Sequence, residues 1–183
     1  TSMATVTDQE ILEYFEKYQG ELSQERNDFF LPQIVDYIND KKWVTVRPQY
    51  QRRPVWDNKK KSRLIESLLM NVPIPPIYLY ENDFNRYEVM DGQQRLNSIL
   101  EFYSNRLKLS SLDSWKILNG KTYDDLPQKV QRGLDRRRIA ATVIVSDLSD
   151  KPYGPDDIRR QVFDRLNTGG LGLNPQELRN CLY

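Results

Sequence analysis

Histidine is absent from the 183-residue sequence, and cysteine occurs once, at Cys181. These absences exclude a zinc site built on imidazole, a Ser-His or Cys-His nucleophile pair and a histidine-metal nuclease motif within this chain. One cysteine also excludes an internal disulfide, which fits a reducing compartment. No apolar run approaches the roughly 18 residues of a membrane span, and no basic-then-apolar signal pattern is present. We therefore expect a soluble, cytoplasmic protein that does not bind membranes.

The sequence also lacks a large excess of either positive or negative charge, because it contains 27 basic and 26 acidic side chains. Net charge therefore gives no argument for nucleic acid as a partner. The basic residues nevertheless cluster in residues 47–53, 59–63 and 132–138, each of which is either a solvated face or a phosphate-facing patch. The length suits one domain with a core of ordinary size.

Helical and strand patterns alternate along the chain. Thr7-Asp-Gln-Glu10 is a capping box that predicts a helix to about residue 19, and the polar residues 21–27 predict a connection. Further helices are expected at residues 33–39, 58–69, 92–103, 127–135 and from Pro155 to the Gly169-Gly170 pair, with another after Asn174. Strands are expected at residues 43–46 and 139–145, and residues 77–80 and 86–90 should form a hairpin.

The segment Tyr87-Glu-Val-Met-Asp-Gly-Gln-Gln-Arg95 joins a strand to a helix, and it is the strongest candidate site. Unpaired backbone N–H groups and the positive end of the helix dipole favour an anion there. Gly92 lets the backbone approach an anion closely, Gln93 and Gln94 offer amide donors, and Arg95 can place a bidentate fork on phosphate. Asp91 could hold Mg²⁺, orient a water or only cap the helix. With Asp91 as the cap and Arg95 solvated, no ligand would be needed.

Two other segments carry polar residues suited to binding. Phe163-Asp-Arg-Leu-Asn-Thr-Gly-Gly170 ends a helix in polar and flexible residues, although on this segment alone a plain glycine C-cap is the stronger interpretation. Gln49-Tyr-Gln-Arg-Arg53 follows a strand and could present two guanidiniums to phosphate or to nucleic acid.

The order of these motifs resembles a known family. Gln51-Arg-Arg-Pro-Val-Trp-Asp57, the Asp91-Gly-Gln-Gln-Arg95 turn and the Phe163–Gly170 block resemble the N-terminal domain of GmrSD-type restriction enzymes, within the ParB/sulfiredoxin-like nucleotide-binding superfamily. This resemblance implies an α+β fold with a small mixed sheet and surrounding helices. It also implies binding and hydrolysis of a nucleoside triphosphate with Mg²⁺, coupled to recognition of DNA, including modified DNA, and to a C-terminal or separate nuclease domain.

The resemblance assigns roles by position. The catalytic residues are expected to be Asp91, Gln93, Gln94 and Arg95, and Asp91 is the expected Mg²⁺ ligand. The nucleotide-binding residues are expected to be Arg52, Arg53, Gly92, Arg95, Asn167, Thr168 and Gly169. Sulfiredoxin chemistry needs a cysteine in the turn and ParB relatives carry Gly-Glu-Arg-Arg there, so neither reductase activity nor a cytidine-nucleotide preference is expected.

Three functions remain open from the sequence. The first is an NTP-hydrolysing sensor that regulates DNA cleavage by a separate nuclease domain. The second is a non-enzymatic ParB-like DNA-binding module that uses Arg52, Arg53 and residues 136–138 on phosphates. The third, ranked last, is a metal-dependent nuclease using Asp91 with Glu88 or Glu101. We expect an N-terminal helix and linker in residues 1–27 and the nucleotide-binding domain in residues 28–183, excised from a longer protein.

Overall fold

The computed structural model describes residues 4–19, 22–47, 55–146 and 155–169. The expected helix after Asn174 and the nucleotide-binding candidates Arg52 and Arg53 lie outside the described residues. The helices are α1 (Asp8–Tyr18), α2 (Leu31–Asn39), α3 (Asn58–Leu69), α4 (Gln93–Tyr103), the 3₁₀ helix η2 (Lys116–Leu118), α5 (Gln128–Asp135), α6 (Pro155–Asp164) and the π-helical turn η3 (Arg165–Gly169). The strands are β1 (Leu22–Phe30), β2 (Val44–Thr45), β3 (Ile77–Asp83), β4 (Arg86–Asp91) and β5 (Arg138–Ser146).

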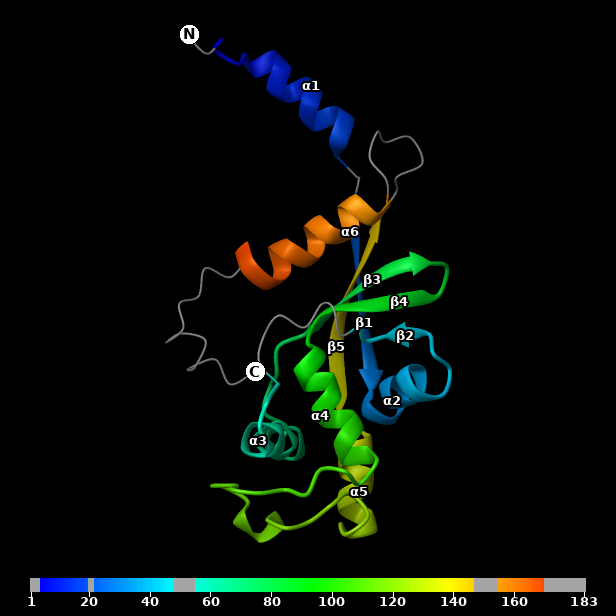
Figure 1. The fold of residues 1–183 in the computed structure, drawn as a ribbon, viewed down its shortest axis with the longest axis vertical. Coiled ribbons are helices and arrows are strands. Elements are labelled where there is room, and N and C mark those ends of the chain that lie inside the picture. Colours follow the sequence, from blue (N-terminus) through cyan, green and yellow to red (C-terminus); the bar gives the residue numbers. More distant parts are fainter. Residues whose placement is uncertain (1–3, 20–21, 48–54, 147–154, 170–183) are drawn as a thin grey trace.

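The five strands form one mixed sheet in the order β1-β5-β3-β4-β2 (Figure 1). β1 runs antiparallel to β5, and β3 runs antiparallel to β4 through the expected hairpin, whose turn contains Asn85 at a φ of 57°. β3 and β5 are parallel, as are β2 and β4. The α+β class with a small mixed sheet is therefore confirmed.

β1 is an edge strand where the sequence analysis expected a polar connection, so that expectation was wrong. Only Phe29 of its nine side chains is buried, which leaves no alternation of apolar residues for a sequence pattern to show. The strand is instead held by backbone pairing along its whole length, from Leu22 opposite Ser146 to Phe30 opposite Arg138. Polar side chains on an exposed edge also discourage pairing with another chain.

The two faces of the sheet carry different layers. Successive residues of β4 alternate between them, since Val89 belongs to the main core under α2, α3 and α4, while Met90 belongs to a smaller cluster with α6. Ile158, Val162 and Phe163 are the buried apolar residues of α6 in that smaller cluster. The turn from Asp91 to Arg95 lies at the end of β4, and Asn167 contacts it from the α6 side.

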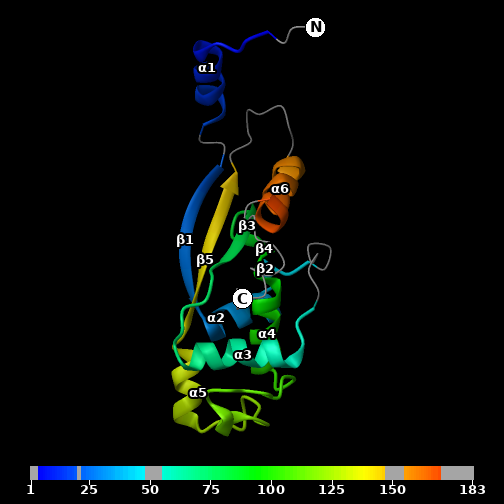
Figure 2. The ribbon, with the colours of Figure 1, turned by 90° about the vertical axis from the view of Figure 1, so that its left-hand side faces the viewer.

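α1 begins with the expected capping box but buries none of its residues. It extends beyond the end of the sheet, whereas α3 and α5 lie at the opposite end of the molecule (Figure 2). None of the described helices has the length and apolarity needed to cross a membrane.

Candidate functional site

The turn between β4 and α4 depends on Gly92. Its φ of 101° lies in the left-handed region, where a side chain is strained. A Cβ at this position would lie 2.5 Å from Cγ2 of Ile77 and 3.1 Å from Nη2 of Arg95. Gly92 is also the N-cap residue of α4, and no side chain caps the first-turn N–H groups. The alternative in which Asp91 serves only as the helix cap is therefore wrong, because Asp91 is the last residue of β4.

Gln93 and Gln94 point into the protein and are 6% and 9% exposed. The Gln93 side-chain amide donates to the carbonyl oxygen of Met90 at 3.2 Å. The Gln94 side-chain oxygen accepts a hydrogen bond from the backbone N–H of Trp56 at 3.0 Å. These two amides thus fix the turn to β4 and to the segment that leads into α3.

Arg95 is also buried, which contradicts the alternative of a solvated side chain. It is 6% exposed, and its Nη2 donates to the carbonyl oxygen of Pro76 at 2.8 Å. The same nitrogen lies 3.7 Å from Oδ2 of Asp91, whose side chain is 19% exposed. Arg95 therefore holds the carboxylate of Asp91 beside the uncapped helix start.

The second motif reaches the same turn from α6. The Asn167 side-chain amide donates at 2.9 Å to the carbonyl oxygen of Met90 and at 2.9 Å to that of Phe163. Met90 O therefore accepts hydrogen bonds from both motifs. Asn167 lies in the π-helical turn η3, which also contains the backbone of Thr168 and Gly169, and such turns are frequent at functional sites. Two segments that are distant in sequence thus meet next to Asp91.

Glu88 is a central residue that the sequence analysis considered only as a nuclease carboxylate. Its side chain is 0% exposed and accepts a hydrogen bond from Nη1 of Arg159 at 2.8 Å. Nε of Arg47 lies 3.1 Å from its other oxygen. Arg159 was not among the predicted site residues. The signal in the sequence was a glutamate, Glu88, between apolar neighbours within a strand, because such a buried carboxylate needs a charged or hydrogen-bonding partner.

The carboxylates near the turn do not form a metal site from protein ligands alone in the described part of the chain. The part of the chain that the structure describes contains no group of three or more His, Cys, Asp or Glu side chains that could hold a metal ion. Glu88 is paired with two guanidiniums, and Glu101 pairs with Lys61 at 2.8 Å. Mg²⁺ commonly takes one or two carboxylates together with substrate phosphates, so Asp91 fits as a single ligand of that kind.

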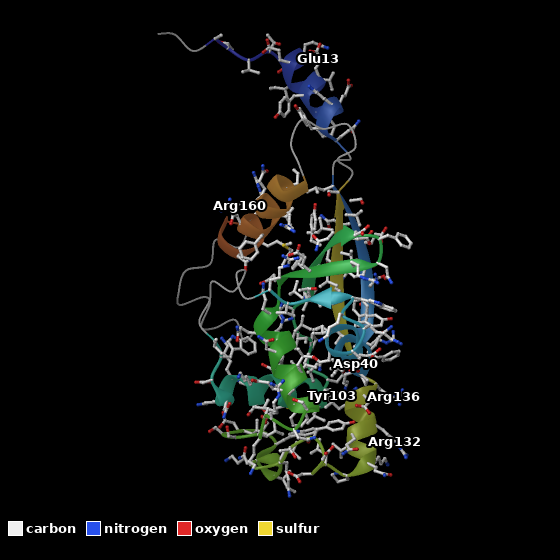
Figure 3. All side chains as sticks on the ribbon, turned by 45° about the vertical axis from the view of Figure 1, so that its right-hand side comes forward. Glu13, Asp40, Tyr103, Arg132, Arg136 and Arg160 are labelled. Atoms are coloured by element: carbon white, nitrogen blue, oxygen red, sulfur yellow. The ribbon has the colours of Figure 1, made fainter. Side chains whose placement is uncertain are left out.

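Several clustered cations have partners within the fold. Lys60 lies 4.9 Å above the ring of Trp56. Arg137 donates to the carbonyl oxygens of Leu68 and Leu69 at 2.9 and 3.1 Å, which satisfies the C-terminal end of α3. Arg137 is thus a structural residue, whereas Arg132 on α5 and Arg136, the residue that follows α5, are exposed (Figure 3).

Comparison with known families supports the resemblance that the motifs indicate. The model described as GmrSD restriction endonuclease, N-terminal domain, matches residues 9–183 and therefore covers both motifs. No curated protein matches the chain.

Proposed function

This chain belongs to the family of GmrSD restriction endonuclease N-terminal domains and so to a restriction and phage-defence system, in which we propose that it binds and hydrolyses a nucleoside triphosphate. In this role it is a sensor that regulates DNA cleavage by a separate nuclease domain. Its place in the ParB/sulfiredoxin-like superfamily is part of the same proposal.

The convergence of two motifs on the carbonyl oxygen of Met90 carries the proposal. Gln93 and Asn167 both donate to this oxygen, and Gly92 follows two residues later. The first-turn N–H groups of α4 have no capping side chain, and the helix dipole adds positive potential there. A phosphate group is the ligand that such a helix start favours.

The proposed roles follow from the directions of the side chains. Gly92 gives a phosphate access to the backbone, and Asp91, steadied by Arg95, would hold Mg²⁺ or orient the attacking water. Bound Mg²⁺ would supply neutralisation of the negative charge on the phosphates. The hydrogen bonds of three side chains stabilise the turn, namely those of Gln93, Gln94 and Asn167. The proposed nucleotide contacts remain Arg52, Arg53, Thr168 and Gly169.

Phosphate release from each NTP in the presence of Mg²⁺ tests this function directly. We expect release by the wild-type chain and a loss of about 100-fold in kcat for Asp91→Asn. Asp40→Asn is the matched control, because Asp40 is an exposed carboxylate at the end of α2 (Figure 3). Equal turnover by wild type and Asp91→Asn would remove Asp91 from the mechanism, and no turnover by wild type would refute hydrolysis.

A non-enzymatic DNA-binding module is the second candidate. The exposed arginines Arg132, Arg136 and Arg138 favour it, since they lie on or next to α5. DNA binding through phosphates would weaken steeply with salt, and each arginine removed would lower that salt dependence. If the addition of nucleotide does not change the affinity for DNA, this module is favoured over the NTPase.

A further inference from the structure

Glu88 lies on β4 and is approached by residues of β2, β3 and α6. On β4 it lies opposite Thr45 of β2 and Tyr80 of β3. Its side chain is on the same face of the sheet as that of Met90, two residues later, which packs in the α6 cluster. Arg159 approaches it from α6, and Arg47 approaches from the segment that follows β2.

The two guanidiniums at Glu88 differ in their surroundings. Arg159 belongs to α6 and its side chain is 23% exposed, whereas that of Arg47 is 38% exposed. Arg47 meets Glu88 through Nε, and among the described residues it makes no other polar contact. Its two terminal nitrogens, Nη1 and Nη2, are therefore available to a ligand and can donate in parallel to two oxygens of one phosphate.

Arg47 has the more exposed of the two guanidiniums. A guanidinium that a buried carboxylate holds at one nitrogen loses little further freedom when its other nitrogens bind an anion. A phosphate on the exposed side of Arg47 would therefore meet donors that are already oriented.

We propose that Arg47 is a further phosphate-binding residue of the nucleotide site and that Glu88, anchored by Arg159, is the positioning residue that orients it. This inference rests on the proposed nucleotide-binding function. Glu88 precedes Asp91 by three residues of β4, which corresponds to about 10 Å along the strand. A single nucleotide is long enough to contact both the turn at Gly92 and Arg47.

Nucleotide affinity in a double-mutant cycle tests the proposal. The dissociation constant of the Mg²⁺-bound NTP is measured for wild type, Arg47→Gln, Glu88→Gln and the double variant. We expect each single variant to bind about tenfold more weakly, and we expect Glu88→Gln to add nothing in the Arg47→Gln background. Turnover at saturating nucleotide should hardly change, because the lost contact serves binding.

Arg160→Gln is the matched control, since Arg160 neighbours Arg159 on α6 but is exposed (Figure 3). Its affinity should equal that of wild type. If Glu88→Gln fails to fold, Glu88→Asp replaces it in the cycle, and Arg47→Gln still tests the contact itself.

Three results would contradict all or part of the proposal, and they are distinguishable. If wild type binds nucleotide and Arg47→Gln binds it equally well, the inference fails and the proposed function stands, even if Arg47→Gln weakens DNA binding. If wild type binds no nucleotide, both fail. Additive losses in the double variant would leave Arg47 as a contact but refute the positioning role of Glu88.

Discussion

The left-handed backbone of Gly92 and the nearby Cγ2 of Ile77 together predict that no other residue is tolerated at this position. Gly92→Ala should lower the free energy of unfolding by roughly 2–4 kcal/mol, through backbone strain and overpacking. Gly133→Ala is the control, because Gly133 lies within α5 and nothing lies within 4 Å of its Cβ position. It should stabilise the protein by about 0.5–1 kcal/mol. Urea unfolding of both variants measures the contrast, and similar shifts would contradict the geometry of the turn.

Substitution of Arg95 should lower the free energy of unfolding as well as the turnover of nucleotide. Arg95→Lys removes the planar fork and weakens the bond to the carbonyl oxygen of Pro76, so we expect a loss of about 1–3 kcal/mol. Unfolding should therefore be followed together with turnover, below the melting temperature of the variant. An unchanged urea midpoint would show that the Pro76 contact contributes little.

The sequence predicted which residues form the candidate turn but did not predict where their side chains point. Gln93, Gln94 and Arg95 look like ligand-facing donors in the sequence, because they are polar residues at a helix start. In the fold they are buried and bonded to Met90, Trp56 and Pro76. Trp56 and Pro76 are distant in sequence, so no local pattern indicates that they cover the helix start.

Removal of a helix cap should affect global stability in α3 but not in α1, because α3 is well buried and α1 is exposed. Thr7→Ala removes a cap from α1, which buries no residue, whereas Asp57→Ala removes the side chain that accepts from Lys60 N at 2.9 Å on the well-buried α3. Each cap is worth about 1 kcal/mol. Thr7→Ala should speed amide hydrogen exchange in α1 and leave the urea midpoint unchanged, while Asp57→Ala should lower the midpoint. A lower midpoint for Thr7→Ala would show that α1 contributes to global stability.

The contact between α4 and α5 should weaken at high pH. Tyr103 and Tyr123 both donate to Oδ1 of Asp135, at 2.8 and 3.0 Å. Burial and the hydrogen bond to Asp135 raise the pKa of Tyr123 from 10.0 to about 12, and the same causes raise the pKa of Tyr103 further. Since the folded pKa values exceed the unfolded ones, this stabilisation is complete below pH 10 and is lost as pH rises through about 12.

Tyr123→Phe tests this pH dependence. The variant lacks the titrating group, so its stability deficit relative to wild type should shrink between pH 10 and pH 12. Tyr14→Phe on the exposed face of α1 should show no such trend. Urea midpoints across this range are the measurement, and a deficit for Tyr123→Phe that does not vary with pH would contradict the assignment.

Elements with a local signature were predictable, and elements held by distant pairing were not. The capping box predicted α1, and the turn-rich residues 81–85 predicted the hairpin, because both signals lie within a few residues. β1 was not predicted because it is held by pairing with β5, which is its neighbour in the sheet but is distant from it in sequence. The π-helical turn η3 was likewise missed, since it continues α6 without a break in composition.

On the scale of the whole molecule, the sheet brings three separate segments to the end of β4. Arg47 follows β2, Asn167 follows α6, and the Gly92 turn begins α4. The sequence predicted the α+β class and two of these three segments as candidates. It could not predict that they meet, because strand order and the packing of α6 on β4 depend on contacts between residues that are distant in sequence.

Nucleotide binding is the central claim, and a thermal-shift panel of the wild-type chain tests it most directly. At a concentration of about 100 times the dissociation constant, a ligand stabilises the folded state by about 2.7 kcal/mol. For a chain of this length the melting temperature should therefore rise by roughly 5–10 °C with at least one NTP and Mg²⁺. No shift with any NTP, together with a shift on adding DNA alone, would contradict the account and favour the DNA-binding module.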